Sequence, residues 1–320
     1  MNVLVTGANG FIGKNLCLEL KNQGYTILPF DVDKSDKDLA DNILAADFII
    51  HLAGVNRPLN NKEFYDGNTN FTKKLIDFIL LNGKKIPLIF SSSTQAELDN
   101  DYGKSKKMAE EFLFDFMDKQ DNPVIIYRLT NVFGKWCKPN YNSVVATFCH
   151  NIANDLPIEI RDENYILKLV YIDDVVKEFI HCLSETKSLN NKKIREVQPA
   201  YSLSLGELAN KLLSFKKTRE TFFVPDIKTD FDRKLYSTYI SYYGADDFAY
   251  DFKMNVDDRG SFTELLKTFA DGQVSVNVSK PGITKGNHYH HTKNEKFIVV
   301  SGECEIKFRK IGTEDVISYR

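Results

Sequence analysis

The sequence lacks the long apolar runs of a membrane protein and the paired cysteines of a secreted one. No run approaches the roughly 20 apolar residues that cross a bilayer. The five cysteines are an odd number and lie far apart along the 320 residues, which favours reduced thiols over a disulfide framework. A predicted strand stands where a signal peptide would be. We therefore expect a cytoplasmic protein that is not attached to a membrane.

The chain also has almost no net charge. Its formal charge is -2, from 42 basic and 44 acidic residues. Nucleic-acid binding needs a clustered basic excess, so we expect no nucleic-acid partner. Hydrophobic residues make up 42% and charged residues 27%, which is typical of a soluble globular protein, and the length suits two domains.

Short apolar runs alternate with amphipathic patterns in the first half of the chain. Strands are predicted at residues 3–5, 26–28, 48–50, 87–90 and 124–127. Helices are predicted between them, for example at residues 14–23 and 71–81, and a later one at 203–215 with Ser204 as its N-cap and Glu207 completing a capping box. This alternation predicts an α/β fold with a Rossmann-type, doubly wound parallel sheet over residues 1–243.

The pattern changes after about Tyr250. Short β-type runs at residues 274–278, 296–300 and 305–308 are separated by turn signals. They predict a second domain, residues 244–320, that forms part of a β-barrel or jelly roll. Because the sequence stops at Arg320 within a predicted strand, we expect this barrel to be incomplete.

A glycine-rich turn follows the first predicted strand. Gly7, Gly10 and Gly13 permit a tight turn, close approach of a pyrophosphate and close packing of the next helix, whose N-terminus offers N–H groups to phosphates. Asp31 closes the second strand, where a carboxylate binds ribose hydroxyls and repels a 2′-phosphate, which favours NAD(H). Lys34 would instead attract that phosphate, so NADP(H) stays open.

Tyr102 and Lys106 lie four residues apart where a helix is predicted to begin, so their side chains share one face. We expect the ammonium to lower the pKa of the phenol, which can then exchange a proton with an alkoxide during hydride transfer. Three serines end the preceding strand. We choose Ser93 as the hydroxyl that binds a substrate carbonyl, with Ser92 and Ser91 as alternatives. The predicted catalytic residues are Ser93, Tyr102 and Lys106.

Three of the six histidines fall between Asn287 and Glu295. On a strand, His288 and His290 would share one face, and Glu295 would return from the following strand. Two imidazoles and a carboxylate suit Zn²⁺, Fe²⁺ or Mn²⁺. His288, His290 and Glu295 are therefore the predicted metal ligands, and a surface histidine cluster is the alternative.

The order of these residues resembles the extended short-chain dehydrogenase/reductase superfamily. The glycine turn, then residues 51–53, then Ser93, Tyr102 and Lys106 match its pattern. The predicted cofactor-binding residues are Gly7, Gly10, Phe11, Ile12, Gly13, Asp31, Leu52, Ala53 and Lys106. Residues 128–134 and 170–175 resemble two segments of its nucleotide-sugar enzymes. This resemblance implies that Asn131 contacts the substrate, whereas Asp173 and Asp174 could equally be structural caps.

Residues 282–302 resemble the first cupin motif, with His288, His290 and Glu295 at its ligand positions. Residues 257–264 resemble the opening segment of sugar-epimerase cupins. The second cupin motif, which brings a further histidine, is absent from the sequence. The resemblance thus implies a divalent metal, preferably zinc, in an intact cupin.

A reductase joined to a cupin, together with residues 133–143, resembles a family of capsular polysaccharide synthesis enzymes. The resemblance implies a UDP-keto-sugar substrate, NADP(H), a homodimer and two steps. The cupin would epimerise C3 of a UDP-4-keto-6-deoxy-N-acetylhexosamine, and the reductase would reduce its C4 ketone. The alternatives are a nucleotide-sugar 4-epimerase or 4,6-dehydratase, or a non-catalytic dinucleotide-binding regulator. A dehydratase would need an acid beside the serines, where only Glu97 is near.

Overall fold

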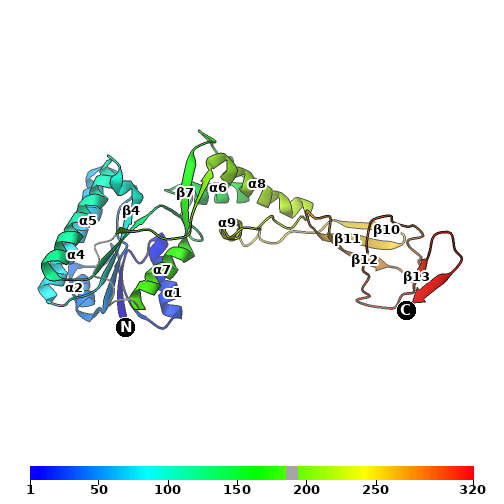
Figure 1. Cartoon of the computed structure of the whole chain (residues 1–320), viewed down its shortest axis with the longest axis horizontal. Coiled ribbons are helices and arrows are strands. Elements are labelled where there is room, and N and C mark those ends of the chain that lie inside the picture. The colour runs from blue at the N-terminus through cyan, green and yellow to red at the C-terminus, as the bar shows by residue number, and fades with distance from the viewer. Residues whose placement is uncertain (185–193) are drawn as a thin grey trace. The chain divides into compact units, whose positions relative to one another are not determined.

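The computed structural model describes residues 1–184 and 194–320 (Figure 1). The chain divides into two compact units. The first comprises Met1–Lys253 and Thr263–Val276, and the second comprises Met254–Phe262 and Asn277–Arg320. Within the described residues, no helix combines the length and the apolar character needed to span a membrane. A domain boundary after residue 243 stays a prediction.

A six-stranded sheet, all of whose pairings are parallel, forms the centre of the first unit, as predicted (Figure 1). Its strands, in spatial order, are β2 (Thr26–Phe30), β1 (Asn2–Thr6), β3 (Phe48–His51), β4 (Leu88–Ser93), β5 (Val124–Leu129) and β8 (Ile194–Arg195). The four central strands are almost completely buried, because helices cover both faces of the sheet. The predicted α/β, Rossmann-type fold is confirmed.

Alternate side chains of each strand enter opposite cores. Val3 and Val5 of β1 pack on one face with α1 (Phe11–Asn22) and α7 (Ile172–Ser184). Leu4 packs on the other face with three further helices. These are α2 (Asp36–Ala45), α4 (Phe71–Asn82) and α5 (Asp101–Gln120). The sheet is therefore a rigid platform with loops at its carboxyl edge.

A second, three-stranded sheet in the first unit consists of β6 (Asn131–Phe133), β7 (Ile166–Tyr171) and β9 (Ala200–Ser204). The remaining helices of this unit are α3 (Lys62–Phe64), α6 (Val144–Ala153), α8 (Leu205–Thr221) and α9 (Asp230–Ile240), with a π-helical turn η1 (Tyr65–Asn70) and a 3₁₀ turn η2 (Thr94–Glu97). Helix α8 begins as predicted. Ser204 caps it, and Ser204 and Glu207 exchange hydrogen bonds of 3.1 and 2.7 Å in a capping box.

The C-terminal strands form a three-stranded sheet and a two-stranded sheet. They are β10 (Met254–Asp257), β11 (Gly260–Lys267) and β12 (Gln273–Ser279), then β13 (Ile306–Arg309) and β14 (Val316–Tyr319). The predicted strands at 274–278 and 305–308 thus correspond to β12 and β13.

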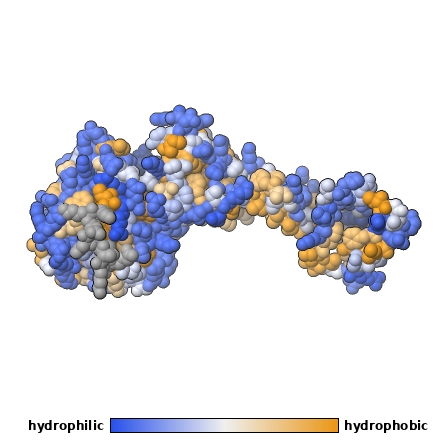
Figure 2. Space-filling model, viewed as in Figure 1, coloured by the Kyte–Doolittle hydropathy of each residue, from blue (hydrophilic) through white to orange (hydrophobic). Residues whose placement is uncertain are grey.

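Two predictions for this region are wrong. Residues 296–300 form no strand, and neither do His288 and His290. No neighbouring strand pairs with either segment, so their backbone groups have no ladder to join. Of residues 254–320, all of which the structure describes, only Gly260 is buried. Many apolar side chains here are exposed, such as Ile298 and Val300 at 85% and 94%, and Figure 2 shows apolar patches on the surface of this region.

Candidate active site

The turn between β1 and α1 has no room for side chains at two of its glycines. Gly7 has a φ of +69°, and a Cβ there would lie 2.8 Å from the backbone nitrogen of Ala53. A Cβ at Gly13 would lie 2.1 Å from the carbonyl oxygen of Gly7. The backbone is therefore bare where the turn meets the helix, as a bound diphosphate requires.

The N-terminus of α1 is open to an anion. Gly10 is the N-cap and gives no side-chain hydrogen bond, and the first turn carries no acidic residue. The predicted contacts Phe11 and Ile12 are the first two helical residues and are half-buried against the core. The uncapped N–H groups and the helix dipole suit the phosphates of a dinucleotide.

The strand order reverses at this turn. The chain passes from β1 to β2 on one side and then to β3 on the other side of β1. Ligands of such sheets bind at the carboxyl ends of the strands at this switch point. Leu52 and Ala53, which follow β3, donate hydrogen bonds to the Thr6 carbonyl and hydroxyl oxygens, each at 3.2 Å. The structure thus places two predicted cofactor residues beside the glycine turn.

Asp31 is half-buried at the end of β2, and its carboxylate faces the same turn. Oδ2 accepts the backbone N–H of Asn9 at 2.7 Å, and Oδ1 accepts that of Val32 at 2.8 Å. Lys34 is exposed, and its backbone N–H bonds the Asp31 carbonyl at 3.0 Å. Backbone donors therefore fix a negative charge next to the predicted cofactor site.

His51 is fully buried at the end of β3. Its Nδ1 lies 2.7 Å from the Thr6 hydroxyl and its Nε2 lies 2.9 Å from the Thr72 hydroxyl. Thr72 donates its own proton to the Asn68 carbonyl at 2.6 Å, so it must accept from Nε2–H of His51, and Nδ1 accepts from Thr6. Burial lowers the pKa of His51 to about 3, with a smaller contribution from Lys106, so the ring is neutral. His51 is a packed strand-end residue.

The three predicted catalytic residues come together at the end of β4. Tyr102 lies in the first turn of α5, which Asn100 caps through a 2.8 Å hydrogen bond to Gly103 N–H. The Ser93 side chain acts on the Tyr102 hydroxyl and opposes the rise in its pKa that burial causes. Lys106 is buried, its Nζ donates to the Ser91 carbonyl at 3.0 Å, and it lies 4.9 Å from the centre of the Phe90 ring.

The lysine also adjoins the cofactor turn. A Cβ on Gly54, which follows Ala53, would lie 3.0 Å from Nζ of Lys106. The backbone nitrogen of Ala53 in turn would lie 2.8 Å from a Cβ on Gly7, so Ala53 packs against the glycine turn. The glycine turn, the end of β3 and the start of α5 therefore form one continuous site.

The expected lowering of the tyrosine pKa by the lysine is wrong for this structure. Burial raises the pKa of Tyr102, and the hydrogen bond from Ser93 opposes this only in part. Burial also lowers the pKa of Lys106 to about 8, while the Glu110 carboxylate acts in the opposite direction. The physical reason is that the ammonium turns toward the Ser91 carbonyl, so desolvation dominates at the phenol.

The three serines have different partners. Ser91 Oγ donates to the His51 carbonyl at 3.3 Å, and Ser92 Oγ donates to the Glu110 carboxylate. Ser93 accepts the backbone N–H of Gln95 at 3.1 Å, and of the three serines it is the one that acts on the pKa of Tyr102. This arrangement favours Ser93 as the hydroxyl that meets a substrate oxygen.

Sequence reasoning missed a buried ion pair behind these serines. Glu110 of α5 accepts two hydrogen bonds from Arg128 of β5, at 3.0 and 2.7 Å. Arg128 also donates to Glu97 at 2.7 Å. One signal was available, because Glu110 follows Lys106 by four residues, as Lys106 follows Tyr102.

Asn131 lies exposed on β6, and its side-chain amide donates to the Lys168 carbonyl at 3.1 Å. Asp173 and Asp174, in the first turn of α7, accept from Lys135 at 2.5 Å and from Lys234 at 2.8 Å. The two aspartates are thus engaged in ion pairs. A substrate contact at Asn131 stays a prediction.

The predicted metal ligands approach one another in the second unit. Nε2 of His288 lies 3.2 Å from Nε2 of His290, which lies 3.7 Å from Oε1 of Glu295. Lys293 pairs with the same carboxylate oxygen at 2.6 Å. Across the residues that the structure describes, no three or more His, Cys, Asp or Glu side chains form a group arranged to hold a metal ion. Metal binding here stays a prediction.

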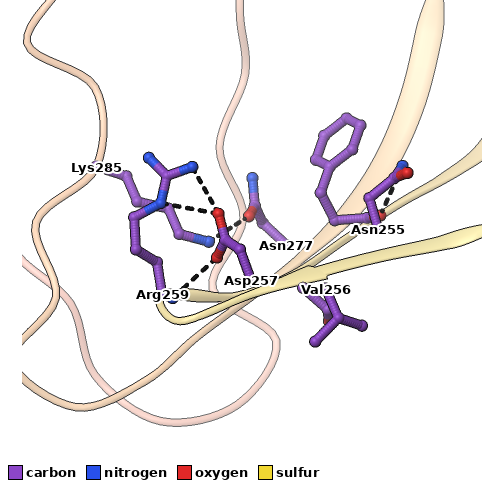
Figure 3. Close-up of a pocket in the computed structure, with 8 residues that line it drawn as sticks. Asn255, Val256, Asp257, Arg259, Asn277 and Lys285 are labelled. Carbon is purple, nitrogen blue, oxygen red and sulfur yellow. Dashed lines mark hydrogen bonds and ion pairs between the residues drawn. The ribbon is translucent and has the colours of Figure 1, made fainter.

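A hollow of about 330 Å³ lies in the same unit (Figure 3). Its polar side chains pair with one another. Arg259 donates to Asp257 at 2.9 and 2.6 Å, and Lys285 donates to Asn277 at 2.9 Å. Both cations therefore already have partners in the hollow.

Two family models match the chain. The NAD dependent epimerase/dehydratase family matches residues 3–197, and the polysaccharide biosynthesis C-terminal domain matches residues 255–320. The UDP-2-acetamido-2,6-beta-L-arabino-hexul-4-ose reductase of Pseudomonas aeruginosa is 48% identical over 314 residues, which are 98% of this chain and 84% of that protein.

Solved structures agree with this similarity. The capsular polysaccharide assembling protein CapF from Staphylococcus aureus is 47% identical, with a TM-score of 0.90 over 100% of this chain and 86% of that one. The UDP-glucuronic acid 4-epimerase from Bacillus cereus, solved with NAD, is 19% identical with a TM-score of 0.63, over 76% of this chain and 98% of that one, and shows the fold alone. The predicted resemblance to capsular polysaccharide enzymes is confirmed.

Proposed function

Because the chain belongs to the NAD dependent epimerase/dehydratase family, we propose that its first unit reduces the C4 ketone of a UDP-4-keto-6-deoxy-N-acetylhexosamine. One observation carries the proposal, namely that Ser93, Tyr102 and the buried Lys106 come together where β4 ends and α5 begins. The name of the P. aeruginosa relative, a UDP-hexul-4-ose reductase, supports the same substrate class.

The residues present fit a nicotinamide dinucleotide. The bare backbone at Gly7 and Gly13 and the open N-terminus of α1 would hold the diphosphate, and Leu52 and Ala53 would line the path toward Lys106. When bound, the reduced nicotinamide supplies a hydride to the carbonyl carbon.

The protein's own groups manage the oxygen and the proton. The Ser93 hydroxyl donates a hydrogen bond to the ketone oxygen, and the Tyr102 phenol gives up its proton as that oxygen becomes an alkoxide. The raised pKa of Tyr102 keeps the phenol protonated at neutral pH, as a donor in the reducing direction requires. Lys106, held by the Ser91 carbonyl and adjoining Gly54, would add a positive charge on the cofactor side of the site.

The second unit is proposed to epimerise C3 before this reduction. A 4-keto group acidifies the C3–H, so a proton can leave and return while the ketone persists. Reduction removes the acidifying group and fixes the configuration. The match of residues 255–320 to the polysaccharide biosynthesis C-terminal domain supports a role in the same pathway class.

A divalent ion in this unit would be held by His288, His290 and Glu295. The 3.2 Å between the two imidazole nitrogens is close to the roughly 3.3 Å expected for two nitrogens bound to one tetrahedral zinc. Such an ion would polarise a carbonyl oxygen as a Lewis acid.

The placement of Glu97 argues against a 4,6-dehydratase. That reaction needs an acid beside the serines, and the Glu97 carboxylate is exposed and paired with Arg128. An epimerase, in contrast, would regenerate its cofactor, so net consumption of NAD(P)H separates it from a reductase.

The test is turnover of a UDP-4-keto-6-deoxy-N-acetylhexosamine by the whole chain, followed as NADH or NADPH oxidation. We expect Tyr102→Phe to lower kcat by roughly 100-fold or more, because no proton reaches the alkoxide. Tyr165→Phe, at an exposed tyrosine, is the control and should match the wild type. Absence of net cofactor oxidation by the wild type, or near-normal turnover by Tyr102→Phe, would refute the proposal.

A further inference from the structure

Three consecutive serines of β4 each contact a different residue of α5. The contacts are Ser91 carbonyl with Lys106, Ser92 hydroxyl with Glu110, and Ser93 hydroxyl with Tyr102. The three helix residues are spaced by four, so they occupy one helical face in successive turns. We call these three pairs the serine contacts. Two of them involve the residues proposed for proton transfer, and the third involves Glu110.

Glu110 is held more firmly than a helix-surface acid would be. Its side chain is 3% exposed, and Arg128 binds both carboxylate oxygens with Nε and Nη2. Bidentate, charge-assisted pairs fix geometry as well as energy. Loss of Arg128 would leave a buried, unpaired carboxylate and would strongly destabilise the folded protein. The pair therefore fixes the position of α5 relative to β4 and β5.

We propose that Glu110 is a positioning residue of the ketone-reducing site, which holds Tyr102 and Ser93 on one substrate oxygen and places a negative charge one helical turn from Lys106. This inference rests on the proposed function for its substrate. It assigns to Arg128 the role of holding Glu110.

The surroundings of Lys106 support the electrostatic part. Among the described residues, the titratable groups that interact with it are Glu110 on α5 and the neutral His51 on β3. From β4 it meets the Ser91 carbonyl and the Phe90 ring. The charge of Glu110 therefore opposes, in part, the lowering of the Lys106 pKa by burial.

The first experiment compares Glu110→Gln with Glu111→Gln, which makes the same charge change at the exposed neighbouring residue. We expect Glu110→Gln to lower kcat by roughly ten- to a hundredfold, as a small displacement of reacting groups does. The KM for the keto sugar should stay within about twofold, since the substrate contacts remain. The basic limb of the pH profile of kcat should move to lower pH, because the lysine loses its anion.

Two conservative variants separate positioning from a merely structural role. Glu110→Asp keeps the charge but shortens the side chain, so it should restore the basic limb without restoring kcat. Ser92→Ala removes one hydroxyl and leaves the ion pair, so kcat should fall severalfold with no shift in pH. If all three variants have wild-type kcat, or if kcat falls only in proportion to lost folded protein, the inference is overturned.

A substrate-free measurement keeps the two proposals apart. Titration of ¹⁵N-labelled lysine side chains by NMR should show a lower pKa for Lys106 in Glu110→Gln than in Glu111→Gln. Equal values would overturn the inference even if the wild type turned out to reduce no keto sugar. Conversely, a wild type without turnover but with this difference would refute only the proposed function.

Discussion

At the scale of single residues, the fixed carboxylate of Asp31 bears on the choice of cofactor. Backbone N–H groups of Asn9 and Val32 hold both of its oxygens, so its charge cannot turn away from the turn where an adenosine ribose would lie. A 2′-phosphate placed there would meet a negative charge. The position of this charge beside the expected ribose therefore favours NADH, whereas the family resemblance implies NADPH.

Substitution of this carboxylate gives a direct test. We expect Asp31→Asn to raise the ratio of kcat/KM for NADPH to that for NADH by about tenfold, which corresponds to roughly 1.4 kcal/mol of repulsion removed. Asp33→Asn, at an exposed acid two residues away, should leave the ratio unchanged. An unchanged ratio in Asp31→Asn would show that this carboxylate does not select the cofactor.

His51 links residue chemistry to acid stability. Its pKa is about 3 in the folded chain and about 6.5 when unfolded, so between these values the unfolded chain binds one more proton. The free energy of unfolding therefore falls as pH drops from about 6.5 toward 3, by up to about 1.4 kcal/mol per pH unit from this group. Above pH 6.5 this contribution is constant.

We expect His51→Gln to be less stable than the wild type at pH 7.5 but to lose stability more slowly on acidification. Urea unfolding at several pH values between 7.5 and 4 measures both quantities. Parallel curves for the two proteins would contradict a neutral, buried histidine in the native state.

The residues proposed for proton transfer could be picked out from the sequence because their pattern is local. A spacing of four residues indicates Tyr102 and Lys106, and a position at the end of a predicted strand indicates Ser93. Glu110 could not be distinguished from a solvent-exposed acid of a helix, because its partner Arg128 lies 18 residues further along the chain, on strand β5. Only a pairing between distant elements separates the two cases.

At the scale of elements, strands and helices with strong hydrophobic periodicity were predictable. All five strands predicted in the first unit are present, and the helix after the glycine turn begins at Phe11 rather than at residue 14. Residues 296–300 have the composition of a strand but no pairing partner. A β-propensity describes how a segment packs on neighbours, so composition alone cannot form a strand.

Helix α8 holds the segment that follows α9 through one side chain. Nη2 of Arg219 donates to the carbonyl oxygens of residues 247–249 at 2.6, 3.0 and 3.0 Å. Its guanidinium also lies 4.2 and 4.8 Å from the ring centres of Tyr243 and Tyr250. A segment without regular secondary structure thus depends on one cation for its order.

We expect Arg219→Met to raise the rate of proteolytic cleavage within residues 243–253 by about tenfold, because local opening becomes easier. Limited trypsin or chymotrypsin digestion with mass spectrometry of the fragments measures it. Lys217→Met, at an exposed residue of the same helix, should leave the cleavage rate unchanged. Equal rates for the two variants would show that the segment is held by other contacts.

At the scale of the whole molecule, the N-terminal and C-terminal parts of the chain differ in how many of their side chains are buried. The first has two buried cores on either side of a sheet, whereas residues 254–320 bury little beyond Gly260. The α/β half could therefore be predicted from periodicity. For residues 254–320, the short strands and the histidine pattern indicated a family resemblance but not the strand pairing, since a local pattern cannot specify which strands pair.

Metal binding by residues 254–320 can be tested on the whole chain. We expect His288→Ala to lower the zinc retained after dialysis from roughly one ion per chain to a small fraction, because two imidazoles and a carboxylate are the proposed ligands. His291→Ala removes a neighbouring imidazole that is not a proposed ligand, and should leave the zinc content unchanged. Equal zinc contents for the two variants, measured by atomic emission, would contradict the assignment.

A run of three identical side chains carries no information about alignment. Neutral hydrogen bonds between these residues and α5 would tolerate small displacements of the helix along the strand. The salt link between Glu110 and Arg128 breaks this degeneracy, since a guanidinium anchored on β5 admits a single placement of the acid. An uncharged substitute there would therefore loosen the placement of α5 on the sheet, and with it the alignment of the residues proposed for proton transfer.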